Sequence, residues 1–105
     1  MDFKIIWSDA AIADLQEVWS YVAQHDPQAA DRIGRGILDH VRVLASFPFI
    51  GPTYPRGARG RLREIVFRSY RIFYDVSEES LSVEILHVWQ GAHDEPAFRL
   101  GSHPK

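Results

Sequence analysis

Cysteine is absent from the 105-residue sequence. Its absence excludes disulfide bonds, thiolate catalysis and cysteine-based zinc sites, and it suits a reducing cytoplasm. Long apolar runs are absent too, since none approaches the ~18 residues that a membrane-spanning helix needs. The start, MDFKIIWSDA, lacks the basic region and the apolar run of a signal peptide. We therefore expect a cytoplasmic protein that does not enter a membrane.

Motifs for metals and phosphates are also missing. The histidines have neither His-x-x-x-His nor His-Glu-x-x-His spacing; they are His25, His40, His87, His93 and His103. No glycine-rich phosphate loop opens a helix, and there is no Gly-x-Ser-x-Gly nucleophile elbow. We expect no metal and no cofactor.

The composition is sufficient for one packed core. Hydrophobic residues make up 46% of the chain and aromatic residues 12%, which is enough without a metal or a disulfide staple. We expect a single domain over residues 1–105, with residues 100–105 frayed.

The net charge of −2 conceals a basic segment between residues 56 and 71. Only Glu64 opposes the six arginines of this segment, which are Arg56, Arg59, Arg61, Arg63, Arg68 and Arg71. Such a segment can face a polyanion or an acidic partner protein. The alternative is a solvated, arginine-rich loop.

The first part of the chain predicts a strand and a helix. Phe3–Trp7 is short and rich in β-formers, and Ser8 after it suits a helix N-cap. Apolar residues at helical spacing extend this helix to about His25. We expect Trp19 in its core-facing stripe, together with Ile12, Leu15, Val18 and Val22.

The dipeptide Asp26-Pro27 predicts a second helix, with aspartate as the N-cap and proline at the first helical position. Phe47-Pro48 ends this helix. Gly34 and Gly36 lie in its interior, where each costs about 1 kcal/mol relative to alanine. Their expected use is the close approach of a neighbouring helix.

Three strands follow a long irregular loop from Pro48 to Gly60. The strands are expected at Leu62–Arg68, Tyr70–Val76 and Leu81–Trp89, with a tight connection near Ser69 between the first two. The order β-α-α-β-β-β predicts an α+β fold in which a helical hairpin packs on one face of a mostly antiparallel four-stranded sheet. The other face, with its aromatic residues and arginines, is expected to be open and to bind a partner.

The segment REIVFRSYRIFYDV (Arg63–Val76) and the following VEILHVWQGAHDEPAF (Val83–Phe98) carry a family resemblance. Together with the helical hairpin and the Pro/Gly/Arg loop, they resemble the RelE/ParE superfamily of toxins from type II toxin–antitoxin modules. The resemblance implies one of two activities. RelE-like members are ribosome-dependent mRNA endonucleases, whereas ParE-like members inhibit DNA gyrase, and a cognate antitoxin neutralises both.

The resemblance also suggests which residues would act in a nuclease. Arg71 occupies the position of the central-strand arginine, and His93 stands where the family commonly has arginine. Histidine can act as an acid or a base near neutral pH, but local hydrogen bonding is the alternative role for His93. Phe98 falls near the late tyrosine of the nucleases and has no proton to give. These departures favour the ParE-like activity, without turnover, over metal-independent RNA cleavage; a nontoxic antitoxin-binding co-repressor is a further alternative.

Partner binding is the common element of these hypotheses. We expect a toxin–antitoxin hetero-oligomer in which antitoxin or target contacts the six arginines, Phe73 and Trp89. The target is DNA gyrase or, in the alternative, the ribosome and its mRNA. Packing is the alternative role for Trp89, and for Arg71 the alternative is a structural ion pair with Asp75, Glu84 or Asp94.

Overall fold

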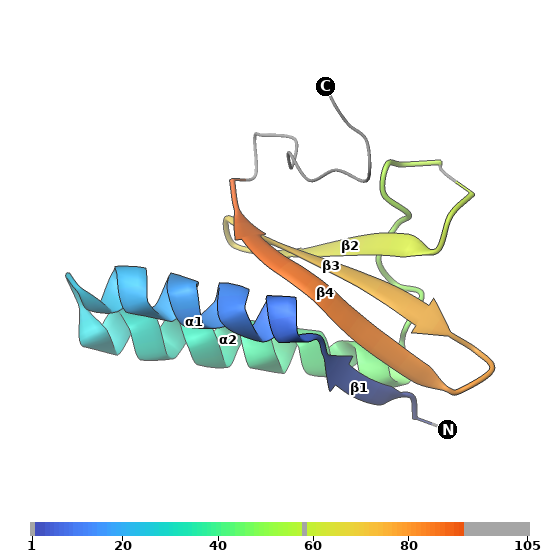
Figure 1. Ribbon diagram of the computed structural model, residues 1–105, viewed down its shortest axis with the longest axis horizontal. Helices are drawn as coiled ribbons and strands as arrows, with labels where there is room; N and C mark the ends of the chain where they lie inside the picture. The colour runs from blue at the N-terminus through green and yellow to red at the C-terminus, as the bar shows by residue number, and fades with distance from the viewer. Residues whose placement is uncertain (1, 58, 92–105) are drawn as a thin grey trace.

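The computed structural model describes residues 2–57 and 59–91. The order of elements is the predicted one (Figure 1): β1 (Lys4–Trp7), α1 (Asp9–Ala23), α2 (Pro27–Ser46), β2 (Leu62–Phe67), β3 (Tyr70–Ser77) and β4 (Ser82–Gln90). The α+β fold class is therefore confirmed. His93, Phe98 and the predicted frayed end lie outside the described residues.

The sheet has the strand order β1-β4-β3-β2. β1 runs parallel to β4, and the other two pairs are antiparallel, which confirms a mostly antiparallel sheet. A two-residue connection of Arg68 and Ser69 joins β2 to β3, and Arg68 adopts a left-handed φ of 56°. β3 thus lies in the interior of the sheet, and β2 forms one of its edges.

Both helices pack on one face of this sheet, as predicted (Figure 1). Alternate residues of β3 point toward the helices and form the core with α2; they are Tyr70, Ile72, Tyr74 and Val76, packed with Ile37, Val41 and Leu44. The intervening residues Arg71, Phe73 and Asp75 point to the opposite face. β3 therefore contributes side chains both to the core and to the opposite face of the sheet.

Side-chain caps fix both helix starts as the sequence predicts. The Ser8 Oγ accepts a hydrogen bond of 3.0 Å from the Ala11 N–H, and the Asp26 carboxylate accepts one of 3.1 Å from the Ala29 N–H. Pro27 follows at the first helical position. No helix in the described ranges is long and apolar enough to cross a membrane.

The prediction that Trp19 lies in the core-facing stripe of α1 is wrong. The side of α1 that faces the core is centred on Ala11, Leu15 and Val18, while Trp19 is 43% exposed. Its indole N–H donates a 3.1 Å hydrogen bond to the Asp31 carboxylate of α2. An indole has an apolar body and a polar edge, so it lies stably along the rim of the helix pair.

The two glycines of α2 serve different neighbours. A Cβ at Gly34 would lie 3.7 Å from the Trp19 ring of α1, an ordinary contact. A Cβ at Gly36 would lie 2.2 Å from the ring of Phe67, which belongs to β2. The close approach expected of a neighbouring helix is therefore made, at Gly36, by a side chain of the sheet. Gly36 is the position where the absence of a side chain lets α2 lie against β2.

Candidate functional site

The loop before β2 is ordered against that strand. The Tyr54 N–H donates a 2.8 Å hydrogen bond to the Leu62 carbonyl, and the Glu64 N–H donates a 3.1 Å bond to the Pro52 carbonyl. Thr53 forms an isolated antiparallel bridge with Arg63 between these two bonds. The predicted irregular loop thus adds a short strand-like segment to the first half of the β2 edge.

A tyrosine hydroxyl from the core holds the beginning of this loop. The Tyr74 hydroxyl accepts a 2.9 Å hydrogen bond from the Gly51 N–H. A Cβ at Gly51 would lie 2.5 Å from the Glu64 carbonyl oxygen and 2.6 Å from the Tyr74 hydroxyl. Only glycine therefore fits at this position. The Arg63 guanidinium donates a 2.6 Å bond to the Gly51 carbonyl. Burial raises the pKa of Tyr74, against the opposing effects of the Gly51 hydrogen bond and the Arg63 charge.

We expect Tyr74→Phe to lower the free energy of unfolding by about 1–3 kcal/mol at neutral pH, because it leaves the buried Gly51 N–H without its acceptor. Wild-type stability should also fall as the pH rises from about 10 through the raised pKa of Tyr74, because the folded state disfavours the phenolate. The variant should lose less in that range, where the raised pKa of Tyr70 still contributes. Urea unfolding at neutral and alkaline pH measures both effects. An equal alkaline loss in the two proteins would contradict this role of Tyr74.

Arg71 is buried on the face of the sheet opposite the helices. Only 8% of the residue is exposed. Its Nε donates a hydrogen bond to the Glu64 carboxylate on the adjacent strand β2, and the two side chains form a largely buried ion pair. The hydrogen bond from Arg71 to Glu64 raises the pKa of Arg71, with burial opposing it. Arg71 is therefore paired with Glu64, an acid that the sequence did not suggest, while Asp94, one of the three that it did suggest, lies outside the described residues.

Aromatic rings surround this ion pair and extend it into one contiguous cluster. The Arg71 Cζ lies 5.1 Å from the centroid of the Tyr54 ring and 5.3 Å from that of Phe73. The Phe73 ring packs edge-on against Tyr54 at 5.2 Å and Trp89 at 6.1 Å, and Trp89 lies 4.9 Å from His87. Three of the residues predicted as partner contacts, Arg71, Phe73 and Trp89, lie together in this cluster.

The exposure of this cluster differs from the expectation of an open face. Phe73 is 0% exposed, Arg71 is buried, and Trp89 is half-buried. Tyr54 from the loop packs against both Arg71 and Phe73. The loop therefore covers part of the face that the helices leave uncovered, and Trp89 is the more accessible of the two predicted aromatic contacts.

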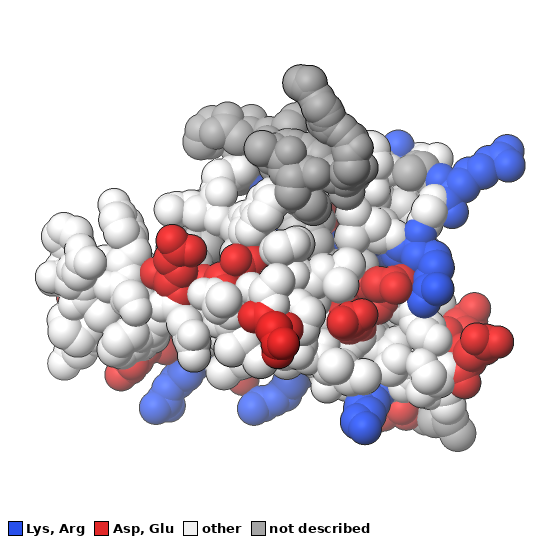
Figure 2. All heavy atoms as spheres, viewed as in Figure 1, with Lys and Arg blue, Asp and Glu red and all other residues white. Residues whose placement is uncertain are grey.

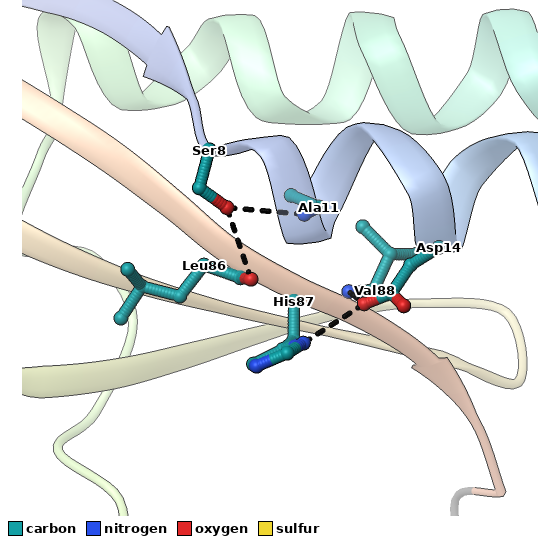
Figure 3. Close-up of polar contacts among 6 residues, drawn as sticks. All are labelled: Ser8, Ala11, Asp14, Leu86, His87 and Val88. Atoms are coloured by element: carbon teal, nitrogen blue, oxygen red, sulfur yellow. Dashed lines mark hydrogen bonds and ion pairs between the residues drawn. The ribbon is translucent and has the colours of Figure 1, made fainter.

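Helix α1 closes the edge of β4 beyond the end of β1 (Figure 3). The Ser8 hydroxyl donates a 3.2 Å bond to the Leu86 carbonyl. One carboxylate oxygen of Asp14 accepts a 3.0 Å bond from the Val88 N–H and lies 2.9 Å from the His87 Nδ1. Sequence reasoning missed Asp14; its signal was an acid three residues after Ala11 on the core-facing side of the helix. These contacts fix the part of β4 that carries Trp89.

The other five arginines divide into tethered and untethered groups. Arg63 bonds to loop carbonyls, and Arg68 lies over the Phe67 ring at 5.4 Å. Arg61 donates to the Val76 carbonyl and lies 2.9 Å from the Asp75 carboxylate, although the angle there does not make a hydrogen bond. Arg56 and Arg59 are exposed, and no polar partner for either is found within residues 2–57 and 59–91. Figure 2 shows a group of basic side chains at the right of the view, around the segment before β2.

An apolar groove lies between α2, the loop and the outer edge of β2. Its volume is about 300 Å³. Its lining includes His40, Val43, Ile50, Pro52, Arg56 and Val66. No sequence pattern predicts this groove, because it is formed by three segments that come together only in the folded chain. Among the described residues, no group of three or more His, Asp or Glu side chains could hold a metal ion.

Comparisons with known proteins agree with this architecture. The family model described as the ParE toxin of the type II toxin–antitoxin system parDE matches residues 5–95. A solved structure of the chromosomal ParDE system from P. aeruginosa has a TM-score of 0.69 at 20% identity, covering 84% of this chain and 95% of that chain. For the toxin–antitoxin complex RelBE2 from Mycobacterium tuberculosis, the TM-score is 0.66 at 19% identity, with 88% and 94% covered. The intact E. coli RelBE complex gives 0.53 at 16%, with 85% and 96% covered. No curated protein matches the chain significantly.

Proposed function

Because the chain belongs to the ParE toxin family of type II toxin–antitoxin systems, we propose that it is a toxin that inhibits DNA gyrase and that a cognate antitoxin neutralises it. The proposal makes the chain an inhibitor that acts by binding another protein and has no turnover of its own. The similar solved structures of the ParDE and RelBE systems support an antitoxin as its partner.

The observation that carries the choice of target is the state of Arg71. A ribonuclease without a metal needs accessible cations to stabilise the charge that develops on the phosphate. Here the guanidinium of Arg71 is paired with Glu64 and lies under two aromatic rings. A phosphate would have to displace a carboxylate that already satisfies this charge. The arrangement supports a surface that binds protein over one that cleaves RNA.

The uncovered part of this face also suits a protein partner. Trp89 and His87 are half-buried and their tilted rings lie in contact, and α1 holds the strand that carries them. Tryptophan is among the residues that contribute most to protein interfaces, and a partly exposed, firmly held ring is the form in which it does so. Arg56 and Arg59 would supply charge around such an interface.

The test is a supercoiling assay with purified chain and purified gyrase. We expect supercoiling to stop when the chain is in molar excess, and to recover when the chain is first mixed with its antitoxin. The matched control is the same chain in a translating extract, where mRNA should remain intact. Full gyrase activity together with cleaved mRNA would replace the proposal by RNA cleavage. Full gyrase activity, intact mRNA and unaffected growth on induction would leave a nontoxic antitoxin-binding co-repressor.

A further inference from the structure

The outer edge of β2 is covered along its first half only. Both loop hydrogen bonds, at the Leu62 carbonyl and the Glu64 N–H, point away from β3. Backbone groups alternate in direction along a strand, so Val66, two residues further on, presents its N–H and C=O to the same outer side. Within the described ranges, neither group has a hydrogen-bond partner on that side. Val66 therefore presents an open donor and an open acceptor on the outer edge of the sheet.

The apolar groove lies directly beside this open pair. Val66 is 48% exposed, Val43 42% and Ile50 60%, and all three line the groove. Phe47, which follows the end of α2, is exposed nearby, since the Ile50 N–H bonds to its carbonyl. The rim carries the exposed guanidinium of Arg56. Backbone groups, an apolar depression and a positive charge thus occur within one short stretch of surface.

We propose that this edge and groove bind an extended segment of the antitoxin, which pairs with Val66 as an added strand. One apolar side chain of the segment would fill the groove, and a carboxylate would lie at Arg56. The geometry is that of strand addition, in which backbone bonds supply affinity and a pocket for alternate side chains supplies specificity. The inference rests on the proposed function, because its occupant is the antitoxin.

Charge and apolar exposure favour the antitoxin over a second copy of the chain as the occupant of this edge. A second copy of the chain would present the same basic segment, residues 56–71, to the basic segment of the first copy, and like charges across an interface oppose association. An acidic segment meets the same charges favourably. An exposed strand edge beside an apolar surface also promotes aggregation unless it is covered. The partner that covers it must therefore be the one bound in the resting state, which is the antitoxin.

Hydrogen exchange at a single amide tests the proposal. The probe is the antitoxin encoded with the chain, in the purified complex. We expect the Val66 N–H to exchange rapidly in the free chain and roughly 100-fold more slowly in the complex. The Glu64 N–H is the internal control, because the Pro52 carbonyl already protects it in the free chain. Unchanged exchange at Val66 in an intact complex would overturn the proposal.

Two substitutions at Val66 provide the matched pair. Val66→Pro removes the outward N–H and leaves the bonds to β3 in place, because a proline whose nitrogen faces outward is tolerated on an edge strand. It should weaken antitoxin binding about tenfold or more. Val66→Thr keeps the N–H and the branched shape, and it should bind within about twofold of wild type. Equal binding by a folded Val66→Pro variant would contradict the added strand.

The outcomes separate this inference from the proposed function. If the antitoxin forms a tight complex and restores growth while Val66 stays unprotected, the strand-addition site is wrong and the toxin assignment stands. If no antitoxin binds, the toxin assignment itself fails. If Val66 is protected in the free chain only at high concentration, the occupant is a second copy, and the antitoxin site is excluded.

Discussion

Glu64→Ala is expected to lower the free energy of unfolding by about 3–5 kcal/mol, because it leaves the Arg71 guanidinium buried without its carboxylate. Both side chains of the pair are largely buried, so water cannot replace the missing charge. For a domain of about this size, such a loss corresponds to a fall in the melting temperature of roughly 12 °C or more. Thermal and urea unfolding of the purified variant measure it.

A double-mutant cycle separates the pair from its surroundings. Arg71→Met should also destabilise the protein, because Glu64 then becomes the unpaired charge. The double variant Glu64→Ala/Arg71→Met removes both charges and keeps most of the apolar volume, so it should be more stable than Glu64→Ala alone. Additive losses in the double variant would show that the two side chains do not stabilise the fold as a pair.

Phe73→Ala is expected to cost about 3–5 kcal/mol of unfolding free energy. The ring is fully buried, and Tyr54 and Trp89 pack against its edges. Its loss would leave a cavity between the loop and the sheet. Denaturant unfolding measures the cost, and disorder of the loop should appear as faster exchange of the Tyr54 N–H, which the Leu62 carbonyl protects.

Phe47→Ala is the matched control for this substitution. The same side chain is removed, but Phe47 is 62% exposed, so the loss should stay within about 0.5 kcal/mol, as at most surface positions. Similar losses in the two variants would mean that the Phe73 pocket collapses around the cavity at little cost.

These two expectations change how binding experiments are read. Phe73 and Arg71 were predicted from the sequence as contacts for a partner, yet their substitution should first destabilise the fold. Weaker antitoxin binding by either variant would therefore report unfolding as well as lost contact. Trp89, Arg56 and Val66 are the positions where a change in binding can be separated from a change in stability, since they are half-buried or exposed.

Local chemistry explains what the sequence could predict. Ser8 and Asp26 cap their helices through their own side chains. Pro27 lies in the first turn of α2, which is where a helix tolerates proline. The connection between β2 and β3 has only two residues, Arg68 and Ser69, so the two strands form an antiparallel hairpin. These features depend on neighbouring residues only, so element order and fold class follow from the sequence.

Contacts between distant segments explain what it could not. Glu64 and Arg71 are seven residues apart, and both a register and a face must be known before they can be paired. Asp14 reaches β4 across most of the chain, and Gly36 accommodates a ring from β2. The prediction for Trp19 was wrong for a related reason. Helical spacing predicts which broad side of α1 is apolar, but the residues at the centre of the buried stripe are decided by the segments that pack against the helix.

The place of β4 between β1 and β3 governs how this molecule can be made. β4 follows the other three strands in the chain, and β1 pairs with it across nearly eighty residues. A nascent polypeptide consequently cannot close its sheet until β4 has emerged from the ribosome, and contacts of such separation slow folding. The face that carries Arg71 and Trp89 therefore forms only after β4 has been made, so a partner that recognises this face cannot bind before then.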